Sequence, residues 1–388
     1  MVWAFSVLSM VDKKRAVKLL QSLVCINSEN PPCDCRKIAA LVKKEMESAG
    51  LSVKTYTFKK NAPTRVGTLK GSGKGKRKSL LLMPHMDTVP AGKGWKHDPF
   101  AAKIVGGKIY GRGTQDCKIH VAACIEAIRS IVESGTKLEG DLVVAMIPDE
   151  ETGSESLGKL LEKKIINPDF ALILDGCAFR AITVQKGLVQ MRVEVFGKKA
   201  HAAWPTLGTN AIGQSAGIIS DLSCLQFNFK AHPLLTGPTL NVGKIKGGEM
   251  VNMVADHCEF DVDIRYLPGM SYSAIMRQVR SIISKHTKAY KITLTDHKEP
   301  YLADKDLPPV KLLLSCMNQH RKTLLAGSPG VNEKVFFEKR NAVSIGFGPE
   351  NMAHVTDEYV RLEDLYEGTA ALEDFIRAHL GVVGKTKR

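Results

Sequence analysis

Short apolar runs without alternation are the main pattern in the two outer parts of the chain. Four of them are Leu80–Met83, Asp141–Pro148, Ala171–Leu174 and Asn341–Pro349. Runs of this length predict strands buried on both faces, as in a parallel sheet covered by helices. Apolar residues at helical spacing predict helices between and beyond these runs, over residues 12–25, 35–50, 116–135, 157–166, 309–319 and 362–380.

The pattern changes between residues 188 and 298. Val189, Met191, Val193 and Val195 alternate with polar residues, which predicts an antiparallel strand with one exposed face. Three more strands are expected near 240–245, 258–265 and 290–295, with helices over 210–222 and 271–286. We therefore expect an α/β protein with a mixed sheet and helices on both faces. Its two segments, 1–187 and 299–388, are interrupted by an α+β insert, 188–298, with a four-stranded antiparallel sheet and two helices.

Composition places the chain among ordinary soluble globular proteins. It has 388 residues, of which 44% are apolar and 24% charged, and no stretch has the length of a membrane span. The apolar start, Met1–Met10, has neither a basic beginning nor a cleavage-site pattern, so we do not expect a signal peptide. Nine scattered cysteines without a CxxC pair indicate reduced thiols. We expect a cytoplasmic protein that does not bind membranes.

The formal net charge is +15, which raises the question of a nucleic-acid partner. The densest basic run, Lys70–Lys78, is glycine-rich and lies between two predicted strands. Aromatic residues, which would stack on bases, do not interleave its charges. A solvated loop is the favoured interpretation, and we expect no nucleic acid as partner. A generally basic chain would also attract substrates that carry a carboxylate.

Each of the four apolar runs leads to an acidic residue or a histidine. His85 and Asp87 follow the first run, Glu150 and Glu151 the second, Asp175 the third, and His354 comes five residues after the fourth. Ligands gather at the carboxyl ends of strands in such sheets. His-x-Asp alone favours a simpler interpretation, a strand-end histidine capped by an aspartate. Several carboxylates and imidazoles at one sheet edge, however, would repel or lose solvation without a cation among them.

A further carboxylate, Asp116, ends the turn Gly111–Asp116, in which two glycines permit a sharp bend. We expect it to begin a helix, and a plain helix cap explains it equally well. Together with the strand-end residues it makes a mixed nitrogen and oxygen ligand set, which suits zinc, cobalt or manganese better than calcium. Five ligands exceed the need of one catalytic zinc and suit two ions that share a carboxylate. Glu150 and Glu151 would point opposite ways, so one is free to handle a proton.

In order along the chain, these residues resemble the motifs of a known family. The matching segments are His85-Met86-Asp87, Gly111-Arg112-Gly113-x-x-Asp116, Asp149-Glu150-Glu151-x-Gly153, Asp175 and Ala353-His354. The family is the di-zinc amidohydrolases, with acetylornithine deacetylase, succinyl-diaminopimelate desuccinylase, aminoacylase and glutamate carboxypeptidase. The resemblance covers nearly the whole chain. It implies that Asp116 bridges two metals, His85 and Asp175 complete one site, Glu151 and His354 the other, Glu150 is the general acid/base, and Asp87 is the partner of His85.

The insert resembles the lid domain of the family, which commonly mediates dimerisation. Lys199–Pro205 is similar to its histidine motif, so the resemblance implies that His201 reaches an active site, usually the partner's, and polarises the scissile carbonyl. By itself, a lone histidine after a strand is more often a surface or core residue. Asn241, Asn252 and Arg265 match lid positions that meet the substrate's carboxylate. The segment from Gly330 stands where deacylases carry a substrate loop, but Val331 replaces a hydroxyl residue, which leaves the substrate open.

The sequence thus predicts a metal-dependent hydrolase that cleaves the amide bond of an N-acyl amino acid, such as an N-acetyl or N-succinyl substrate. The alternative is a carboxypeptidase or dipeptidase of the same family that acts on small peptides. Two divalent ions are expected, zinc foremost and cobalt or manganese as alternatives, in a homodimer formed through the lid. Two alternatives belong to different classes, an inactive metal-retaining protein and a nucleic-acid binder that uses the basic surface. The intact Glu150 argues against the first.

Overall fold

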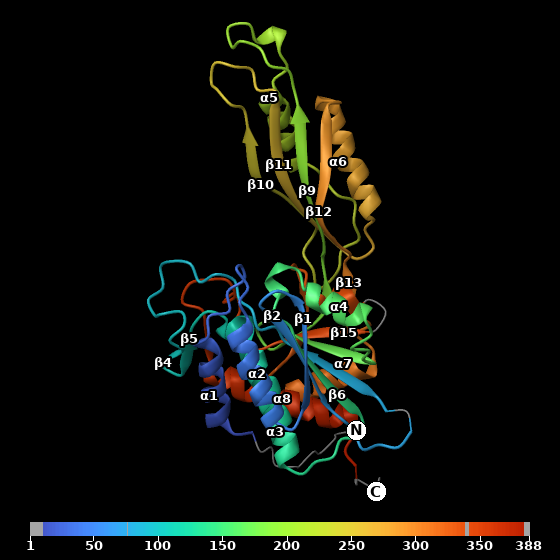
Figure 1. Cartoon of the computed structure of the whole chain (residues 1–388). Helices are drawn as coiled ribbons and strands as arrows, with labels where there is room; N and C mark the ends of the chain where they lie inside the picture. The colour runs from blue at the N-terminus through green and yellow to red at the C-terminus, as the bar shows by residue number, and fades with distance from the viewer. Residues whose placement is uncertain (1–10, 76, 338–340, 384–388) are drawn as a thin grey trace. The chain divides into compact units, whose positions relative to one another are not determined.

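The structure, a computed structural model, describes residues 11–75, 77–337 and 341–383. The expectation for Met1–Met10 therefore lies outside the described residues. The chain divides into two compact units (Figure 1). Unit 1 comprises residues up to Thr183 together with Ala303–Ala326 and the part from Asn332 onward, and unit 2 comprises Val184–Leu302 and Gly327–Val331. No helix in the described ranges is long and apolar enough to cross a membrane.

A mixed sheet runs in the order β1-β2-β6-β3-β7-β15-β8-β13, with β14 paired to β8. Its strands lie in unit 1, except for β13 and the last residues of β8 and β14, which are assigned to unit 2. Its middle strands β6, β3, β7 and β15 are parallel neighbours, whereas β1, β2 and β8 pair antiparallel. The strands are β1 Ser52–Lys59, β2 Ala62–Leu69, β3 Ser79–Met83, β6 Asp141–Met146, β7 Phe170–Leu174, β8 Arg180–Gln185, β13 Tyr301–Leu302, β14 Leu324–Ser328 and β15 Ala342–Gly346.

The apolar runs are the parallel strands, and burial on both faces explains their composition. All five residues of β7 and of β15 are buried, as are Leu80–Met83 of β3. Helix α3 is buried almost throughout and packs on α1 and α8. The helices of this unit are α1 Lys13–Val24, α2 Arg36–Ser48, α3 Ile119–Glu133, α4 Glu155–Glu162, α7 Pro308–His320 and α8 Leu362–Leu380. A small sheet has the order β16-β5-β4, from Tyr359–Arg361, Lys108–Tyr110 and Lys103–Val105.

Unit 2 is an antiparallel sheet in the order β10-β11-β9-β12 with helices α5 and α6. Residues of β9 and β11 alternate between buried and partly exposed, as the period-two pattern predicts. The buried half of each strand joins apolar residues of both helices in one core. The bounds are β9 Gly187–Phe196, α5 Ala211–Ser223, β10 Thr239–Gly247, β11 His257–Tyr266, α6 Tyr272–His286 and β12 Tyr290–Lys298.

The expected fold class is confirmed, both for the mixed sheet with helices and for the separate four-stranded antiparallel sheet. The predicted insert, residues 188–298, lies inside unit 2, which also takes in the segment Gly327–Val331 that contains Gly330. The expected start of a helix at Asp116 is wrong, because α3 begins at Ile119. Asp116 lies in a preceding turn, η1 (Thr114–Lys118), with non-helical backbone angles.

Candidate metal centre

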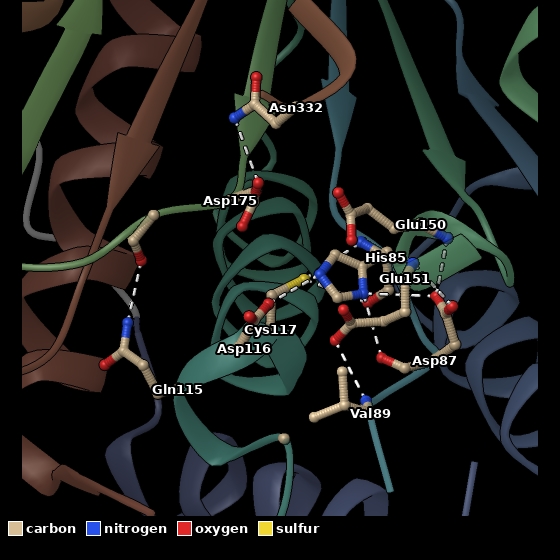
Figure 2. Close-up of polar contacts among 12 residues, drawn as sticks. His85, Asp87, Val89, Gln115, Asp116, Cys117, Glu150, Glu151, Asp175 and Asn332 are labelled. Carbon is tan, nitrogen blue, oxygen red and sulfur yellow. Dashed lines mark hydrogen bonds and ion pairs between the residues drawn. The ribbon is translucent and has the colours of Figure 1, made fainter. Parts of the chain in front are cut away.

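The four strands that lead to the predicted site residues are consecutive neighbours, β6, β3, β7 and β15. Their carboxyl ends therefore meet at one edge of the sheet. Figure 2 shows Asp116, Glu150, Glu151 and Asp175 arranged around the imidazole of His85. Residues that lie up to 90 positions apart in the sequence thus share one neighbourhood. All of them belong to unit 1.

The carboxylate of Asp116 lies between two imidazoles. Its Oδ1 is 2.9 Å from Nε2 of His85, and its Oδ2 is 3.1 Å from Nε2 of His354. Nε2 of His354 is also 3.2 Å from Oε2 of Glu151. Burial would raise the pKa of Asp116, but the contacts with His354 and His85 hold it below its ordinary value. The same contacts with Asp116 and Glu151 raise the pKa of His354 to about 10.

The turn before α3 gives Asp116 this position. Gly113 has a left-handed backbone, φ +82°, and a Cβ there would lie 2.5 Å from a methyl group of Thr88, so only glycine fits. Asp116 itself is extended, with φ −123° and ψ 93°. The helix-cap interpretation is therefore wrong, because the carboxylate contacts imidazoles and no side chain caps α3.

The buried carboxylate of Glu358 holds this turn in place through hydrogen bonds to its backbone. Its Oε1 accepts hydrogen bonds from the backbone N–H groups of Gln115 and Asp116, at 2.7 and 3.2 Å. Its Oε2 accepts from Nη1 of Arg112 at 2.6 Å and from the N–H of Gly113 at 3.1 Å. The Glu358 side chain is fully buried. Such a partner fixes the position of a metal-ligand candidate without touching the metal.

Asp87 contacts His85 with both its backbone and its carboxylate. Nδ1 of His85 is 3.0 Å from the backbone oxygen of Asp87 and 3.4 Å from the carboxylate. The carboxylate also accepts hydrogen bonds from Nδ2 of Asn30 at 2.9 Å and from the N–H groups of Glu150 and Glu151, both at 3.1 Å. Asp87 therefore links the imidazole to the backbone of the two glutamates, and its role toward His85 remains a prediction.

Glu150 and Glu151 lie on a short 3-10 helix, Glu150–Thr152, and not on the extended backbone that the sequence predicts. One carboxylate oxygen of each lies within 4.8 Å of the other and of a ring nitrogen of His85. Glu151 contacts His354, and its Oε1 accepts from the N–H of Val89 at 3.2 Å. A carboxylate oxygen of Glu150 lies within 4.8 Å of those of Asp175 and Glu333. Burial, followed by the charge of Glu333, raises the pKa of Glu150 well above its ordinary value. A raised pKa is what a carboxylate needs to exchange protons near neutral pH.

Asp175 at the end of β7 is held by a polar network. Its Oδ2 accepts from Nδ2 of Asn332 at 3.1 Å, and the same amide donates to Oγ of Ser344 at 2.9 Å. The buried ammonium of Lys334 contacts Asn332 Oδ1 at 2.8 Å and Ser344 Oγ at 2.6 Å. Burial, followed by the charge of Asp116, raises the pKa of Asp175. Burial lowers the pKa of Lys334 to about 7.

The described residues present donor groups that fit two divalent ions. Ligand atoms of Asp116, Glu151 and His354 lie within 4.8 Å of one another, and His85 forms such a group with Asp116 and Cys117. Asp116 belongs to both groups, as a bridging carboxylate must. Imidazole and carboxylate donors suit zinc, cobalt or manganese. Asp175 forms its group with Glu150 and Glu333. The assignment of ligands to the two ions remains a prediction.

Cys117 is packed against the backbone of His85. Its Sγ is 3.1 Å from the N–H of His85, and the thiol donates to the carbonyl of His85 at 3.2 Å. The residue is fully buried. Burial raises the pKa of its thiol to about 12, which favours the neutral thiol.

The predicted substrate-binding residues belong to unit 2. His201 and Asn252 lie on neighbouring segments, where the N–H of Ala202 donates to the carbonyl of Asn252 at 2.9 Å, and both residues are exposed. The guanidinium of Arg265 forks onto Asp263, with Nε to Oδ1 at 2.7 Å and Nη2 to Oδ2 at 3.1 Å.

Two further unit 2 residues were predicted to meet the substrate. Asn241 on β10 is exposed and pairs across the sheet with Asp263 on β11, the residue that Arg265 contacts. Gly330 exchanges hydrogen bonds with the hydroxyl of Ser328, which contacts its N–H at 3.1 Å and its carbonyl at 3.2 Å. Their roles toward a substrate remain predictions.

The sequence analysis did not identify three residues of this site, Glu333, Glu358 and Asn332. Two features of the sequence could have indicated them. Glu358 follows His354 by four residues in a polar segment, and the arginine of Gly111-Arg112-Gly113 required a buried anion. Asn332 and Glu333 stand in the very segment that departs from the deacylase pattern.

Comparison with solved structures shows the same fold. The aminopeptidase PepT of Bacillus cereus aligns with a TM-score of 0.79 at 22% identity, over 95% of this chain and 98% of that one. Human carnosine dipeptidase 1 aligns with a TM-score of 0.72 at 19% identity, over 94% of this chain and 95% of that one. The Bacillus subtilis YXEP protein, described as a dinuclear metal-binding peptidase, aligns with a TM-score of 0.72 at 14% identity, over 95% of this chain and 98% of that one.

A sequence-family comparison agrees with the motifs. Residues 81–378 match the model of the peptidase family M20/M25/M40. This range contains every candidate site residue discussed above, from His85 to Glu358. The resemblance to metal-dependent amidohydrolases is thereby confirmed, and a hydrolase that acts on amide bonds follows from it. The chain belongs to peptidase family M20/M25/M40.

Proposed function

We propose that this protein is a metal-dependent hydrolase of short peptides, most simply a di- or tripeptidase. The carrying observation is the Asp116 carboxylate, which two imidazoles contact, with the half-buried carboxylate of Glu150 within 4.8 Å of one of them, that of His85. The fold neighbours include an aminopeptidase and a dipeptidase, which supports the peptidase alternative over the N-acetyl or N-succinyl amino acids that were expected first. Those N-acyl amino acids remain the comparison class in the test.

In this proposal His85, Asp116 and Asp175 hold one divalent ion, and Asp116, Glu151 and His354 the other, with zinc foremost and cobalt or manganese as alternatives. Such a pair supplies polarisation of the substrate carbonyl and a lowered pKa of bound water. Asp87 keeps Glu150 and Glu151 in place through their backbone N–H groups.

The proton transfers fall to Glu150. Its half-buried carboxylate takes a proton from the attacking water and returns it to the nitrogen of the leaving amine, so that both products leave with the correct protons. The raised pKa of Glu150 suits this role, because a carboxylate of ordinary acidity would be too weak a base to take the proton from water. His201 is proposed to stabilise the oxyanion, and Asn241, Asn252, Arg265 and Gly330 to bind the rest of the substrate.

The assembly and location are part of the same proposal. We propose a homodimer formed through unit 2, supported by exposed apolar side chains there. Val251 is fully exposed, Leu207 is 65% exposed, and Trp204 and Met250 are each 62% exposed, and such surfaces favour protein contacts. We further propose a cytoplasmic location, supported by nine cysteines that are all free thiols.

The test is a substrate screen with a matched variant. Wild-type protein loaded with zinc, cobalt or manganese is assayed on dipeptides, tripeptides, N-acetyl amino acids and N-succinyl amino acids. Glu150→Ala should retain bound metal and lose turnover by several orders of magnitude. Glu155→Gln, on the neighbouring helix α4, serves as the control with near-normal rates. Near-normal rates in the Glu150 variant would refute the assigned mechanism.

A further inference from the structure

The basic run at residues 70–78 has no part in the proposed hydrolysis, and several of its described residues line a cavity. The cavity has a volume of about 640 Å³ and lies between this run, residues 139–140 and the end of helix α8. Cavities of several hundred Å³ are the size that binds small molecules. The cavity therefore raises the question of which ligand it fits.

The cavity lies at the edge of the sheet opposite to the candidate metal centre. Lys78 directly precedes β3 and Gly140 directly precedes β6, whereas His85 and Glu150 follow the carboxyl ends of these two parallel strands. Strands of five or six residues span about 15–20 Å. The cavity is thus separate from the metal centre, and all of its lining residues belong to unit 1.

Backbone hydrogen bonds hold the walls of the cavity together. The N–H of Gly73 donates to the carbonyl of Glu139 at 3.1 Å, and the N–H of Gly140 donates to the carbonyl of Leu380 in α8 at 3.0 Å. A Cβ on Gly73 would lie 2.7 Å from the carbonyl oxygen of Glu139, so this close approach requires glycine. The cavity therefore has walls of anchored backbone, although the run itself is exposed to solvent.

Three cationic side chains line this cavity and only one acidic side chain does. The cations are Lys74, Arg77 and Lys78, and the acid is Glu139. Within the described ranges, neither lysine ammonium has a hydrogen-bond or ion-pair partner. Asp141 holds Arg77, with Nε of Arg77 3.0 Å from Oδ1 and Nη2 3.4 Å from Oδ2, which leaves Nη1 available to a ligand. A concave surface with an excess of positive charge attracts anions.

A second, smaller cavity adjoins the first. Its volume is about 310 Å³, and it shares Arg77, Lys78 and His379 with the larger one. Phe170 and Pro309 also line it, and the rings of His379 and Phe170 have centroids 5.6 Å apart. Nε2 of His379 is buried and has no hydrogen-bond partner in the described part of the chain, which a polar atom of a ligand would supply. The second cavity thus offers room for a planar group beside the cations.

The kind of cation identifies the kind of anion. Arginine forks onto phosphate oxygens, and lysine binds them as a point charge. A chain of two or three phosphates carries enough charge to engage all three cations, whereas one carboxylate does not. A nucleic acid would need exposed aromatic platforms for its bases, but Phe170 is only 2% exposed. These features favour a small phosphorylated molecule over a nucleic-acid strand.

We propose that this cavity binds the oligophosphate chain of a small molecule, with Lys74, Arg77 and Lys78 as its cationic contacts. Free oligophosphate and a nucleoside triphosphate share this chemistry, and the second cavity would take the base of the nucleotide. The proposal goes beyond the proposed hydrolysis and does not depend on it, because the lining residues lie at the other edge of the sheet.

The experiment is calorimetry of the metal-loaded protein with tripolyphosphate and with ATP. Each is added with equimolar magnesium, so that the phosphates do not remove metal from the centre. Wild type should bind both, and Lys74→Gln and Lys78→Gln should each raise Kd about 10-fold, as expected for the loss of one hydrogen bond to a charged group. Both lysines are exposed, so these variants should fold, and their peptide hydrolysis and metal content should match wild type.

Lys70→Gln is the matched control. It removes the same charge from the same run, its side chain is 73% exposed, and it does not line the cavity. Its Kd for either ligand should change less than about twofold. Tighter binding of ATP than of tripolyphosphate would identify a nucleotide as the ligand, and equal binding would identify the phosphate chain alone. Both results support the oligophosphate site.

Three results would overturn the proposal. The first is a wild-type Kd above about 1 mM for both ligands. The second is an equal loss of affinity in Lys70→Gln and Lys78→Gln, which would show diffuse attraction to the basic surface. The third is binding of single-stranded oligouridine that ATP does not displace, which would make the run a nucleic-acid surface. Failure of the protein to cleave any peptide would refute the proposed function and leave this test unaffected.

Discussion

Replacement of Glu358 by glutamine should weaken both the fold and the metal centre. The side chain is fully buried and accepts four hydrogen bonds, two at each oxygen. An amide of the same size keeps one oxygen and turns an NH₂ group toward the other two donors. The remaining oxygen will stay with Arg112, since its contact is the shortest, at 2.6 Å. The NH₂ then faces the backbone N–H groups of Gln115 and Asp116.

The magnitude follows from these contacts. Each buried donor left without an acceptor costs about 1–3 kcal/mol, and two are affected. Loss of the carboxylate charge beside buried Arg112 acts on the same groups and is not additive, and breaking such a pair costs about 3–5 kcal/mol. We expect Glu358→Gln to lose about 3–5 kcal/mol of unfolding free energy. Because Asp116 is displaced with its N–H, metal affinity should fall about 10- to 100-fold, as for other partners behind metal ligands.

The assay has two parts. Urea unfolding gives the free energy, and competition with a chromophoric chelator gives the zinc affinity. Glu363→Gln is the matched control, because it lies five residues away and is exposed. Its free energy of unfolding should change by no more than about 0.5 kcal/mol. If Glu358→Gln matched this control in both stability and zinc affinity, the reasoning about buried acceptors behind Asp116 would be refuted.

Two other predictions concern pH and metal. His379 in α8 packs against Phe375 and Phe170, and burial lowers its pKa to about 4. The unfolded chain binds a proton at this histidine near pH 6.5 while the native state does not, so stability is lost as pH falls from about 6.5 to 4. Between pH 7 and pH 5, the free energy of unfolding of His379→Phe should fall by about 2 kcal/mol less than that of wild type, as measured by urea unfolding. Equal slopes would contradict the burial argument. Dialysis against a chelator should lower the Tm, and zinc at a thousandfold excess over Kd should restore about 4 kcal/mol; Asp116→Asn should recover far less, and full recovery in that variant would count against the bridging role.

The strand-end residues could be predicted because the parallel strands carry a clear signal. Leu80–Met83 and Ala171–Leu174 are apolar throughout because they are buried on both faces of the sheet. The polar residues His85 and Asp175 follow directly after these strands, so the end of each apolar run indicated their position. Alternation in β9 likewise identified the antiparallel sheet of unit 2. In both cases, a local pattern reports directly on the burial of that segment.

Contacts between distant segments carry no such signal. Whether Asp116 caps a helix or faces an imidazole depends on His354, which lies 238 residues later in the chain. The distribution of the hydrogen bonds of Asp87 depends on where the turn at Glu150 places its N–H groups. In the sequence, Glu333 looks like an ordinary polar loop residue. Only the folded structure shows that it lies close to Ser154 and Asp175. These features are set by tertiary packing, which periodicity does not encode.

The residues that hydrogen-bond to the candidate metal ligands and their turns indicate that the backbone of this site is held rigidly. The turn that carries Asp116 is held by Glu358, the turn that carries Glu150 and Glu151 by Asp87, and Asp175 by Asn332. In the first two cases a buried carboxylate accepts from main-chain N–H groups, which have far less conformational freedom than side chains. A turn held in this way keeps its ligand in place whether or not a metal is bound. Substitution of these holding residues should therefore lower metal affinity more than substitution of exposed residues at equal distance, and it should do so without altering the ligand set itself.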